Sequence, residues 1–255
     1  MKKVRSWVRV LLACPMVIAS GAVCAADVRV AVASNLLLPL KSLAREYERA
    51  SGDTLRISAG STGKLYAQIV NGAPFEVFLA ANAREPGRLE AAGLGVAGSR
   101  FTYAVGRLVL WGPAMQDAPQ DMVAVLKAGD FRRLALANPI TAPYGAAALE
   151  VLDHLGLKDQ LQAKLIKGEN ISQAYQYVAS GAAELGFVAL SQLKAQGDDG
   201  RGKYWTIDGK LYAPIRQEAL LLKPGEASPA AKRLLTFLQS APGRKAIEQF
   251  GYGLE

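Results

Sequence analysis

Three observations predict an α/β protein with two lobes, each a mostly parallel sheet flanked by helices. Short apolar segments rich in β-branched residues alternate along the chain with segments of helical periodicity, which is typical of a parallel sheet covered by helices. Glycine ends the first helical segments, at Gly52 and Gly72. The segments also outnumber those that one open sheet of this length commonly uses, which favours two sheets.

The alternation is clearest near the start. Residues 28–34 (VRVAVAS) form a near-continuous apolar run, which is typical of a strand covered on both faces. Residues 38–52 follow with helical spacing, because Leu40, Leu43 and Tyr47 share one face. The sequence then predicts a strand at 55–60, a helix at 63–72 and a strand at 75–82.

The same pattern continues to the end of the chain. Its segments lie at residues 107–113, 121–129, 132–139, 146–157, 169–181, 184–193, 215–225 and 228–253. Among them, 146–157 predicts a helix, 184–193 a strand and then a turn, 215–225 a strand, and 228–253 two closing helices. The polar, glycine-rich residues 195–203 predict a surface loop. We expect the closing helices to pack against the first lobe.

The first 26 residues have the form of a secretory signal peptide. Four positive charges and no acid precede an apolar run that ends in small residues. Such a signal would direct export to the periplasm. Its cleavage before Asp27 would lower the formal charge from +8 to +4 and remove both cysteines. A lipoprotein signal ending at Cys14 is the weaker alternative, because only a short apolar stretch precedes it. The remaining charge is modest and does not indicate nucleic-acid binding.

The residues of common catalytic sites are scarce. His154 is the one histidine, and it lies inside a predicted helix. Without cysteine in the mature chain, thiol chemistry and soft metal sites are disfavoured. None of the familiar zinc-protease, serine-hydrolase or carboxylate-pair patterns occurs. The sequence therefore indicates a binding protein rather than an enzyme.

A serine- and glycine-rich turn, ISAGSTGKLYAQI at residues 57–69, resembles the start of a phosphate-binding loop. That loop requires glycine five residues before its Gly-Lys pair and Ser or Thr after the lysine, where this chain has Ser58 and Leu65. A nucleotide site is therefore rejected. A helix start near Thr62 still offers unpaired N–H groups at the positive end of a helix dipole, which suits another anion. The alternative is that Ser61 only caps its helix, and Lys64 is expected to be a bystander on the helix surface.

Similar polar helix starts recur at residues 33–39, 140–150 and 167–178. Ligands of open α/β sheets bind at the carboxyl ends of strands, where such starts lie. Several of them together can surround one small anion with N–H and O–H donors alone. The side chains and backbone groups that they contribute belong to Ser34 and Asn35, to Pro143, Tyr144 and Gly145, and to Asn170, Ile171 and Ser172.

These segments resemble the periplasmic molybdate-binding proteins of ABC importers, over nearly all of residues 27–255. The most specific matches are residues 30–35, 60–82, 134–157 and 241–255. The resemblance implies a two-lobed periplasmic binding protein (venus-flytrap) fold that closes on a tetrahedral oxyanion. We place lobe 1 at residues 27–106 and 216–255 and lobe 2 at residues 107–215.

The resemblance also implies which residues bind the oxyanion. They are Ser34, Asn35, Ser61, Thr62, Tyr144 and Ile171, the last through its backbone N–H. Either Ser61 or Thr62 provides the contact at the second turn. Some relatives carry a ligand-binding tyrosine where this chain has Ala189. Tyr144 then either supplies that phenol or packs between the lobes without touching the anion.

The resemblance implies molybdate or tungstate as ligand, with no cofactor and no metal beyond the bound oxyanion. An inner-membrane permease with its ATPase would receive it, and we expect a monomer. Sulfate or another tetrahedral oxyanion is an alternative ligand. Two further alternatives are an exported protein that has lost ligand binding and acts in protein interaction, and a secreted enzyme on the same scaffold that uses Glu169 or Glu218.

Overall fold

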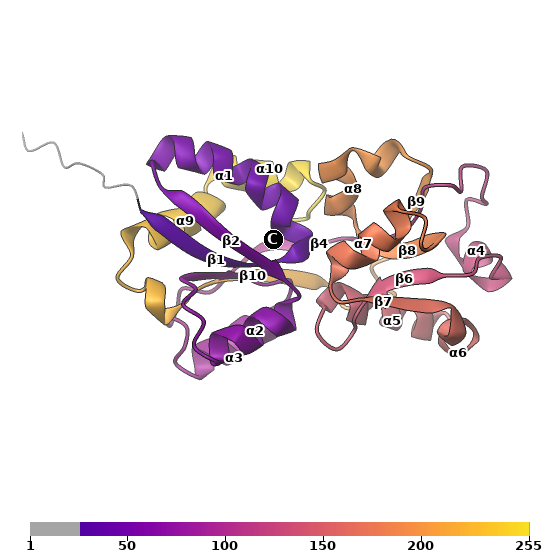
Figure 1. Ribbon diagram of the computed structural model, residues 1–255, viewed down its shortest axis with the longest axis horizontal. Helices are drawn as coiled ribbons and strands as arrows, with labels where there is room; N and C mark the ends of the chain where they lie inside the picture. Colours follow the sequence, from indigo (N-terminus) through magenta and orange to yellow (C-terminus); the bar gives the residue numbers. More distant parts are fainter. Residues whose placement is uncertain (1–25, 255) are drawn as a thin grey trace, which may run out of the picture.

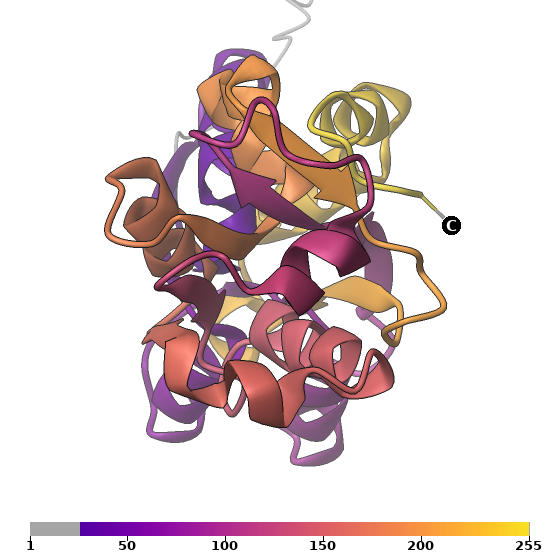
Figure 2. The same ribbon diagram turned by 90° about the vertical axis from the view of Figure 1, so that its right-hand side faces the viewer.

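The computed structural model describes residues 26–254, which form two lobes side by side (Figure 1). The view along the long axis places the second lobe in front of the first (Figure 2). The expected signal peptide falls outside the described residues except for Ala26 and stays a prediction. None of the helices within residues 26–254 combines the length and apolar composition needed to cross a membrane.

The first lobe is built on a five-stranded sheet of order β2-β1-β3-β10-β4. Its strands are β2 (Thr54–Gly60), β1 (Asp27–Ala33), β3 (Val77–Leu79), β10 (Ile215–Leu221) and β4 (Phe101–Gly106). Strands β1, β2 and β3 are parallel, and β10 runs against both of its neighbours. The inward residues of β1, such as Val30 and Val32, are fully buried, as expected for a strand covered on both faces.

The second lobe repeats this plan with the order β7-β6-β8-β5-β9. Its strands are β7 (Leu165–Gly168), β6 (Leu134–Ala137), β8 (Leu185–Ala189), β5 (Leu108–Gly112) and β9 (Lys203–Thr206). Here β5 is the strand that runs against its two neighbours. Both sheets are thus mixed: four of the five strands run in one direction, as expected for a mostly parallel sheet, and one strand runs against its two neighbours.

Helices cover the faces of both sheets. The first lobe carries η1 (Ser34–Leu36), α1 (Leu37–Ser51), α2 (Thr62–Val70), α3 (Arg84–Ala91), η4 (Lys223–Gly225), α9 (Pro229–Gln239) and α10 (Ala241–Gln249). The second carries α4 (Met122–Ala128), α5 (Pro143–His154), α6 (Lys158–Leu161), η2 (Gln162–Lys164), α7 (Ile171–Ala179), α8 (Leu190–Gln196) and η3 (Asp198–Gly200). The closing helices α9 and α10 lie beside α1 on the first lobe, as expected (Figure 1).

The chain passes between the sheets twice. Arg107 links β4 to β5, and the segment between β9 and β10 returns to the first sheet. Both passages lie near the boundaries between the lobe ranges given above, at residues 106–107 and 215–216. The lobe boundaries themselves stay a prediction, because they are defined by which parts move together.

Several elements are absent from the sequence-based prediction. Helix α3 contains Pro86 and Gly87, which lower helix propensity, and β7 and β9 are four-residue strands that include lysines. Strand β4 was also not predicted. The turn expected after β8 is instead helix α8. Segments that are short or have a low helix or strand propensity are stabilised by their neighbours in the fold, so the local sequence pattern does not reveal them.

The two lobes are in contact along the carboxyl ends of the strands. Ala33 is the last residue of β1, and Ala81 lies two residues after the end of β3. Both pack in one apolar cluster with Ala142 and Tyr144 from the second lobe. The small side chains at this boundary let the backbones of the two lobes approach closely. The space that remains between them is the candidate site described below.

An ion pair between the buried carboxylate of Asp53 and the partly exposed guanidinium of Arg233 holds the outer end of the first lobe together. Asp53, 1% exposed, accepts hydrogen bonds from Arg233 Nη2 at 2.7 Å and from Arg233 Nε at 3.0 Å. The Tyr47 hydroxyl also donates to Asp53, at 2.7 Å. Hydrogen bonding to the guanidinium lowers the pKa of Asp53 below its usual value. This contact joins the start of β2 to α9.

Replacing Asp53 by Asn should lower the free energy of unfolding by about 2 kcal/mol, because the charged acceptor of the two hydrogen bonds from the guanidinium is lost. A lowered pKa in the folded state adds stability above the unfolded-state pKa, about 4, and this stability is lost as pH falls through the folded-state value. The difference between wild type and Asp53→Asn should therefore shrink in acid. Denaturant unfolding from neutral to acidic pH measures both effects.

Asp153→Asn is the matched control, because the Asp153–Lys158 pair is solvent-exposed on both sides. It should leave stability unchanged at every pH. Equal losses in the two variants would contradict the assigned role of Asp53.

Candidate ligand-binding site between the lobes

A small cavity lies between the lobes, with about 190 Å³ of empty space when the open space at its mouth is included. The six residues predicted from the sequence all line it, and none of them is more than 6% exposed. The structure thus brings together residues that are separated by up to 137 positions in the chain. That each of them contacts a ligand stays a prediction. The full lining is Ala33, Ser34, Asn35, Gly60, Ser61, Thr62, Ala81, Ala142, Pro143, Tyr144 and Ile171.

Four helical segments begin at this cavity. η1 continues directly from β1, α2 follows β2, α5 follows β6 and α7 follows β7. The first N–H groups of a helix have no partner within the helix, and the helix dipole places partial positive charge there. The cavity is therefore surrounded by donors and positive helix ends that come from both lobes.

Ser61 does not cap its helix. It stands at the N-cap of α2, yet its side chain makes no capping hydrogen bond. Its Oγ is buried without a hydrogen-bond partner. A buried hydroxyl without a partner costs free energy, which a ligand that accepts its proton would recover. The alternative that Ser61 only caps α2 is wrong.

Thr62 and Ile171 each keep one donor available. Thr62 Oγ1 accepts a hydrogen bond from the Ala81 N–H at 3.0 Å, so its own proton remains for another acceptor. At the start of α7, Asn170 Oδ1 accepts from the N–H groups of Ser172 and Gln173. The N–H of Ile171, the first residue of that helix, is left out of this cap.

Asn35 has both of its side-chain protons in use within the protein. Its Nδ2 donates to Gln217 Oε1 and to the Tyr252 hydroxyl, each at 2.9 Å. Its backbone N–H, in the first helical turn, is the donor that remains. Ser172 of the second lobe donates from Oγ to the Ser34 carbonyl at 3.1 Å and so holds this turn in place.

Tyr144 is packed between the lobes and is one of the residues that line the cavity. Its side chain belongs to the core of the second lobe and is 1% exposed. Burial raises the pKa of Tyr144 well above its usual value, so the phenol keeps its proton at neutral pH. Ala189 does not line the cavity, and Tyr144 is the one tyrosine among the residues that do.

The cavity lining contains neither acidic nor basic side chains. Glu218 pairs instead with Arg100, at 2.8 Å, and Glu169 with Lys64. His154 lies exposed on α5, with Nδ1 2.9 Å from the Glu150 carbonyl. Within residues 26–254, groups of three or more His, Cys, Asp or Glu placed to hold a metal are absent. The arrangement suits a small anion held by uncharged donors.

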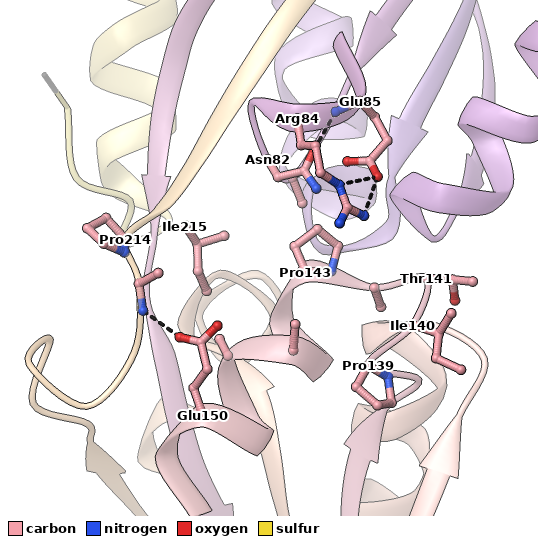
Figure 3. A pocket seen from close by; sticks show the side chains of 15 residues that line it. Asn82, Arg84, Glu85, Pro139, Ile140, Thr141, Pro143, Glu150, Pro214 and Ile215 are labelled. Carbon is pink, nitrogen blue, oxygen red and sulfur yellow. Dashed lines mark hydrogen bonds and ion pairs between the residues drawn. The ribbon is translucent and has the colours of Figure 1, made fainter. Parts of the chain in front are cut away.

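A larger pocket, with about 1070 Å³ of empty space, adjoins the cavity and shares Ala81, Ala142 and Pro143 with it (Figure 3). It carries two carboxylates, Glu85 beside Arg84 and Glu150, which accepts from the Ala213 N–H at 2.7 Å (Figure 3). Carboxylates repel an anion. The smaller cavity is therefore the better anion site.

Two contacts beside the cavity join the lobes directly. The Gly63 N–H donates to the Thr141 carbonyl at 2.9 Å, and a Cβ at Gly63 would lie 3.1 Å from the Thr141 backbone. Lys64 Nζ lies 2.8 Å from Glu169 Oε1, with both side chains about half exposed. Lys64 does not line the cavity, but it is not a bystander, because it pairs across the lobes.

The chain as a whole matches one family of known proteins. A family model described as bacterial extracellular solute-binding protein matches residues 28–253. The chain belongs to this family.

The relatives of this solute-binding protein agree with the resemblance stated above. It is 51% identical to the molybdate-binding protein ModA of Azotobacter vinelandii, with 91% of each chain covered. It is 45% identical to ModA of Rhodobacter capsulatus, covering 91% of this chain and 90% of that one. The solved structure of an A. vinelandii periplasmic molybdate-binding protein superposes with a TM-score of 0.85 at 38% identity, over 89% and 99% of the chains. The predicted fold and the resemblance to molybdate-binding proteins are confirmed.

The sequence analysis missed the polar network behind the cavity of this solute-binding protein. Gln217 is fully buried and contacts Asn35, Tyr103 and Tyr144. The available signal was a polar pair, Gln217 and Glu218, inside the otherwise apolar end of the predicted strand 215–225. Its partners are too far away in the chain for spacing to reveal them.

Ser61→Ala tests the assignment of the free hydroxyl. Because Ser61 Oγ is buried without a hydrogen-bond partner in the described structure, its removal should leave the free energy of unfolding of the unliganded protein unchanged or raise it by about 1 kcal/mol. Ser228→Ala is the matched control, since Ser228 Oγ accepts from the Ala231 N–H and caps α9. That variant should lose about 1 kcal/mol. A larger loss for Ser61→Ala than for Ser228→Ala in denaturant unfolding would contradict the assignment.

Proposed function

We propose that this protein is a periplasmic solute-binding protein that captures molybdate or tungstate between its two lobes. It would deliver the oxyanion to an inner-membrane permease coupled to an ATPase. It would act as a monomer and without catalysis. The names of the two relatives at 51% and 45% identity support molybdate as the ligand.

One observation carries the proposal: a buried cavity between the lobes is lined by hydroxyl and N–H donors and by no charged side chain. Molybdate and tungstate are fully deprotonated dianions at neutral pH, so they only accept hydrogen bonds. Ser34, Asn35, Ser61, Thr62, Tyr144 and Ile171 are the proposed donors. Hydrogen bonds to a charged group are about twice as strong as neutral ones, which favours a ligand of this kind.

The same donors explain a preference among oxyanions. Hydrogen phosphate carries a proton that would face donors, at a cost of about 1–3 kcal/mol for the unpaired group. Sulfate has the charge of molybdate but is smaller, so fixed donors would reach it at longer distances. Molybdate and tungstate are close in size, and this cavity should barely separate them.

The contacts between the lobes support a closing trap. Donors from η1 and α2 belong to one lobe, and those from α5 and α7 to the other. A ligand that binds both sets stabilises the closed form. We propose that the permease recognises this closed form, in which Gly63 and Thr141 are in contact.

Calorimetric titration of the mature protein with four oxyanions tests the proposal. Molybdate and tungstate should bind tightly and with similar affinity, because both accept from every donor. Sulfate and phosphate should bind at least about 100-fold more weakly, since each loses contacts worth about 3 kcal/mol in all. Sulfate binding as strong as molybdate binding would contradict the selectivity, and no binding of any oxyanion would contradict the function.

Ser34→Ala and Tyr144→Phe test the proposed donors. Each removes one hydroxyl that would donate to a charged ligand, so each should weaken molybdate binding by about tenfold to 100-fold without unfolding the protein. Tyr66→Phe is the matched control, because the Tyr66 ring packs against Arg88 and does not line the cavity. If Tyr144→Phe binds molybdate as well as Tyr66→Phe does, Tyr144 is not a donor.

A further inference from the structure

Gln217, on β10, joins the candidate donors of the two lobes. Its side chain is fully buried, at an irregularity in the pairing of β10 with β4 between Gln217 and Glu218. Its Oε1 accepts from Asn35 Nδ2 at 2.9 Å and lies 3.0 Å from the Tyr103 hydroxyl oxygen. Its Nε2 donates to the Tyr144 hydroxyl at 3.1 Å. Gln217 lies on β10 of the first sheet, and Tyr144 lies on α5, which packs on the second sheet. The bond between Gln217 and Tyr144 therefore crosses between the lobes.

The direction of that bond decides what the Tyr144 hydroxyl offers the cavity. An amide nitrogen can only donate, so the phenolic oxygen accepts from Gln217. A phenol has a single proton, and this arrangement leaves it available for a ligand. If the amide were turned over, Oε1 would face Tyr144 and take that proton. Tyr144 would then present only lone pairs to an anion.

Asn35 holds the Gln217 amide in the first orientation. Its Nδ2 donates to Oε1 and is itself held by its second bond, to the Tyr252 hydroxyl. The single proton of Tyr103 lies within reach of both Oε1, at 3.0 Å, and the Ala80 carbonyl, at 3.1 Å. Gly106, the last residue of β4, leaves room for the contact. A Cβ at Gly106 would overlap the Tyr144 hydroxyl and lie 2.7 Å from Gln217 Nε2.

We propose that Gln217 is a positioning residue that turns the Tyr144 hydroxyl into a donor toward the bound oxyanion when the lobes close. Gln217 reaches Tyr144 only across the lobe boundary, so the donor is completed by closure itself. The inference rests on the proposed function, since it names a determinant of that same site. It also predicts that Gln217 affects binding without touching the ligand.

Gln217→Glu tests the direction of the bond by titration with molybdate between about pH 5.5 and about pH 8.5. When deprotonated, the introduced carboxylate can only accept, so Tyr144 donates to it and a negative charge faces the dianion. Binding at the alkaline end should then be roughly 100-fold weaker than in wild type. Once protonated, the acid group can donate as the amide does, so affinity should recover by about tenfold per pH unit as pH falls.

Proton uptake provides a readout that a purely structural role would not change. Titration of Gln217→Glu in two buffers of different ionisation enthalpy should show about one proton taken up per molybdate bound, and wild type should show none. Weak binding of the variant at every pH without proton uptake would overturn the proposal.

Gln217→Met, which has neither donor nor charge, supplies an independent test. It should weaken molybdate binding by about tenfold in the wild-type background and by less than about twofold in the Tyr144→Phe background, because the effect passes through the hydroxyl. Equal losses in both backgrounds, or none in either, would overturn the proposal. Thermal unfolding without ligand identifies the variants that are folded.

The outcomes separate this inference from the proposed function. If wild type binds no oxyanion, the proposed function fails. If wild type binds molybdate while both Gln217 variants bind it equally well at every pH, the function stands and the positioning role is wrong.

Discussion

Under the proposed function, the structure has to offset the cost of burying an anion without a counter-charge. Moving an ion from water to a protein interior costs far more than the net stability of a typical domain unless hydrogen bonds replace its hydration. The cavity between the lobes has no lysine or arginine in its lining, so fixed N–H and O–H groups must supply this replacement. Each donor therefore needs a defined position and no competing acceptor. Ser61 meets both conditions, because its hydroxyl is buried and unpaired.

The two-sheet architecture follows from that requirement. A mostly parallel sheet places the carboxyl ends of its strands at one edge, and the helices that follow begin there. Two such edges facing each other provide four helix starts around one point, as η1, α2, α5 and α7 do. The small residues Ala33 and Ala81 let the edges approach. Under the proposed function, selectivity and closure therefore share one geometric origin with the fold.

The sequence predicted those parts of the molecule that local pattern determines. The β1–η1–α1 and β2–α2 segments were predictable because apolar runs, a helical stripe and a polar helix start are adjacent in the chain. Helix α3 was not, since Pro86 and Gly87 oppose its local propensity. The six cavity residues were identified through motifs at helix starts and the resemblance that these motifs carry. Gln217 was missed because its partners Asn35 and Tyr144 lie 182 and 73 positions away, and no periodicity spans such distances.

A crystal structure of the molybdate complex tests the central claim most directly, namely that uncharged donors from both lobes hold the oxyanion. We predict the metal atom in the cavity between η1, α2, α5 and α7, with its oxygens within about 3 Å of hydroxyl and N–H groups of both lobes. No lysine or arginine side chain should contact it. An anion bound beside Arg84 in the adjoining pocket, or held by donors of one lobe only, would contradict the account.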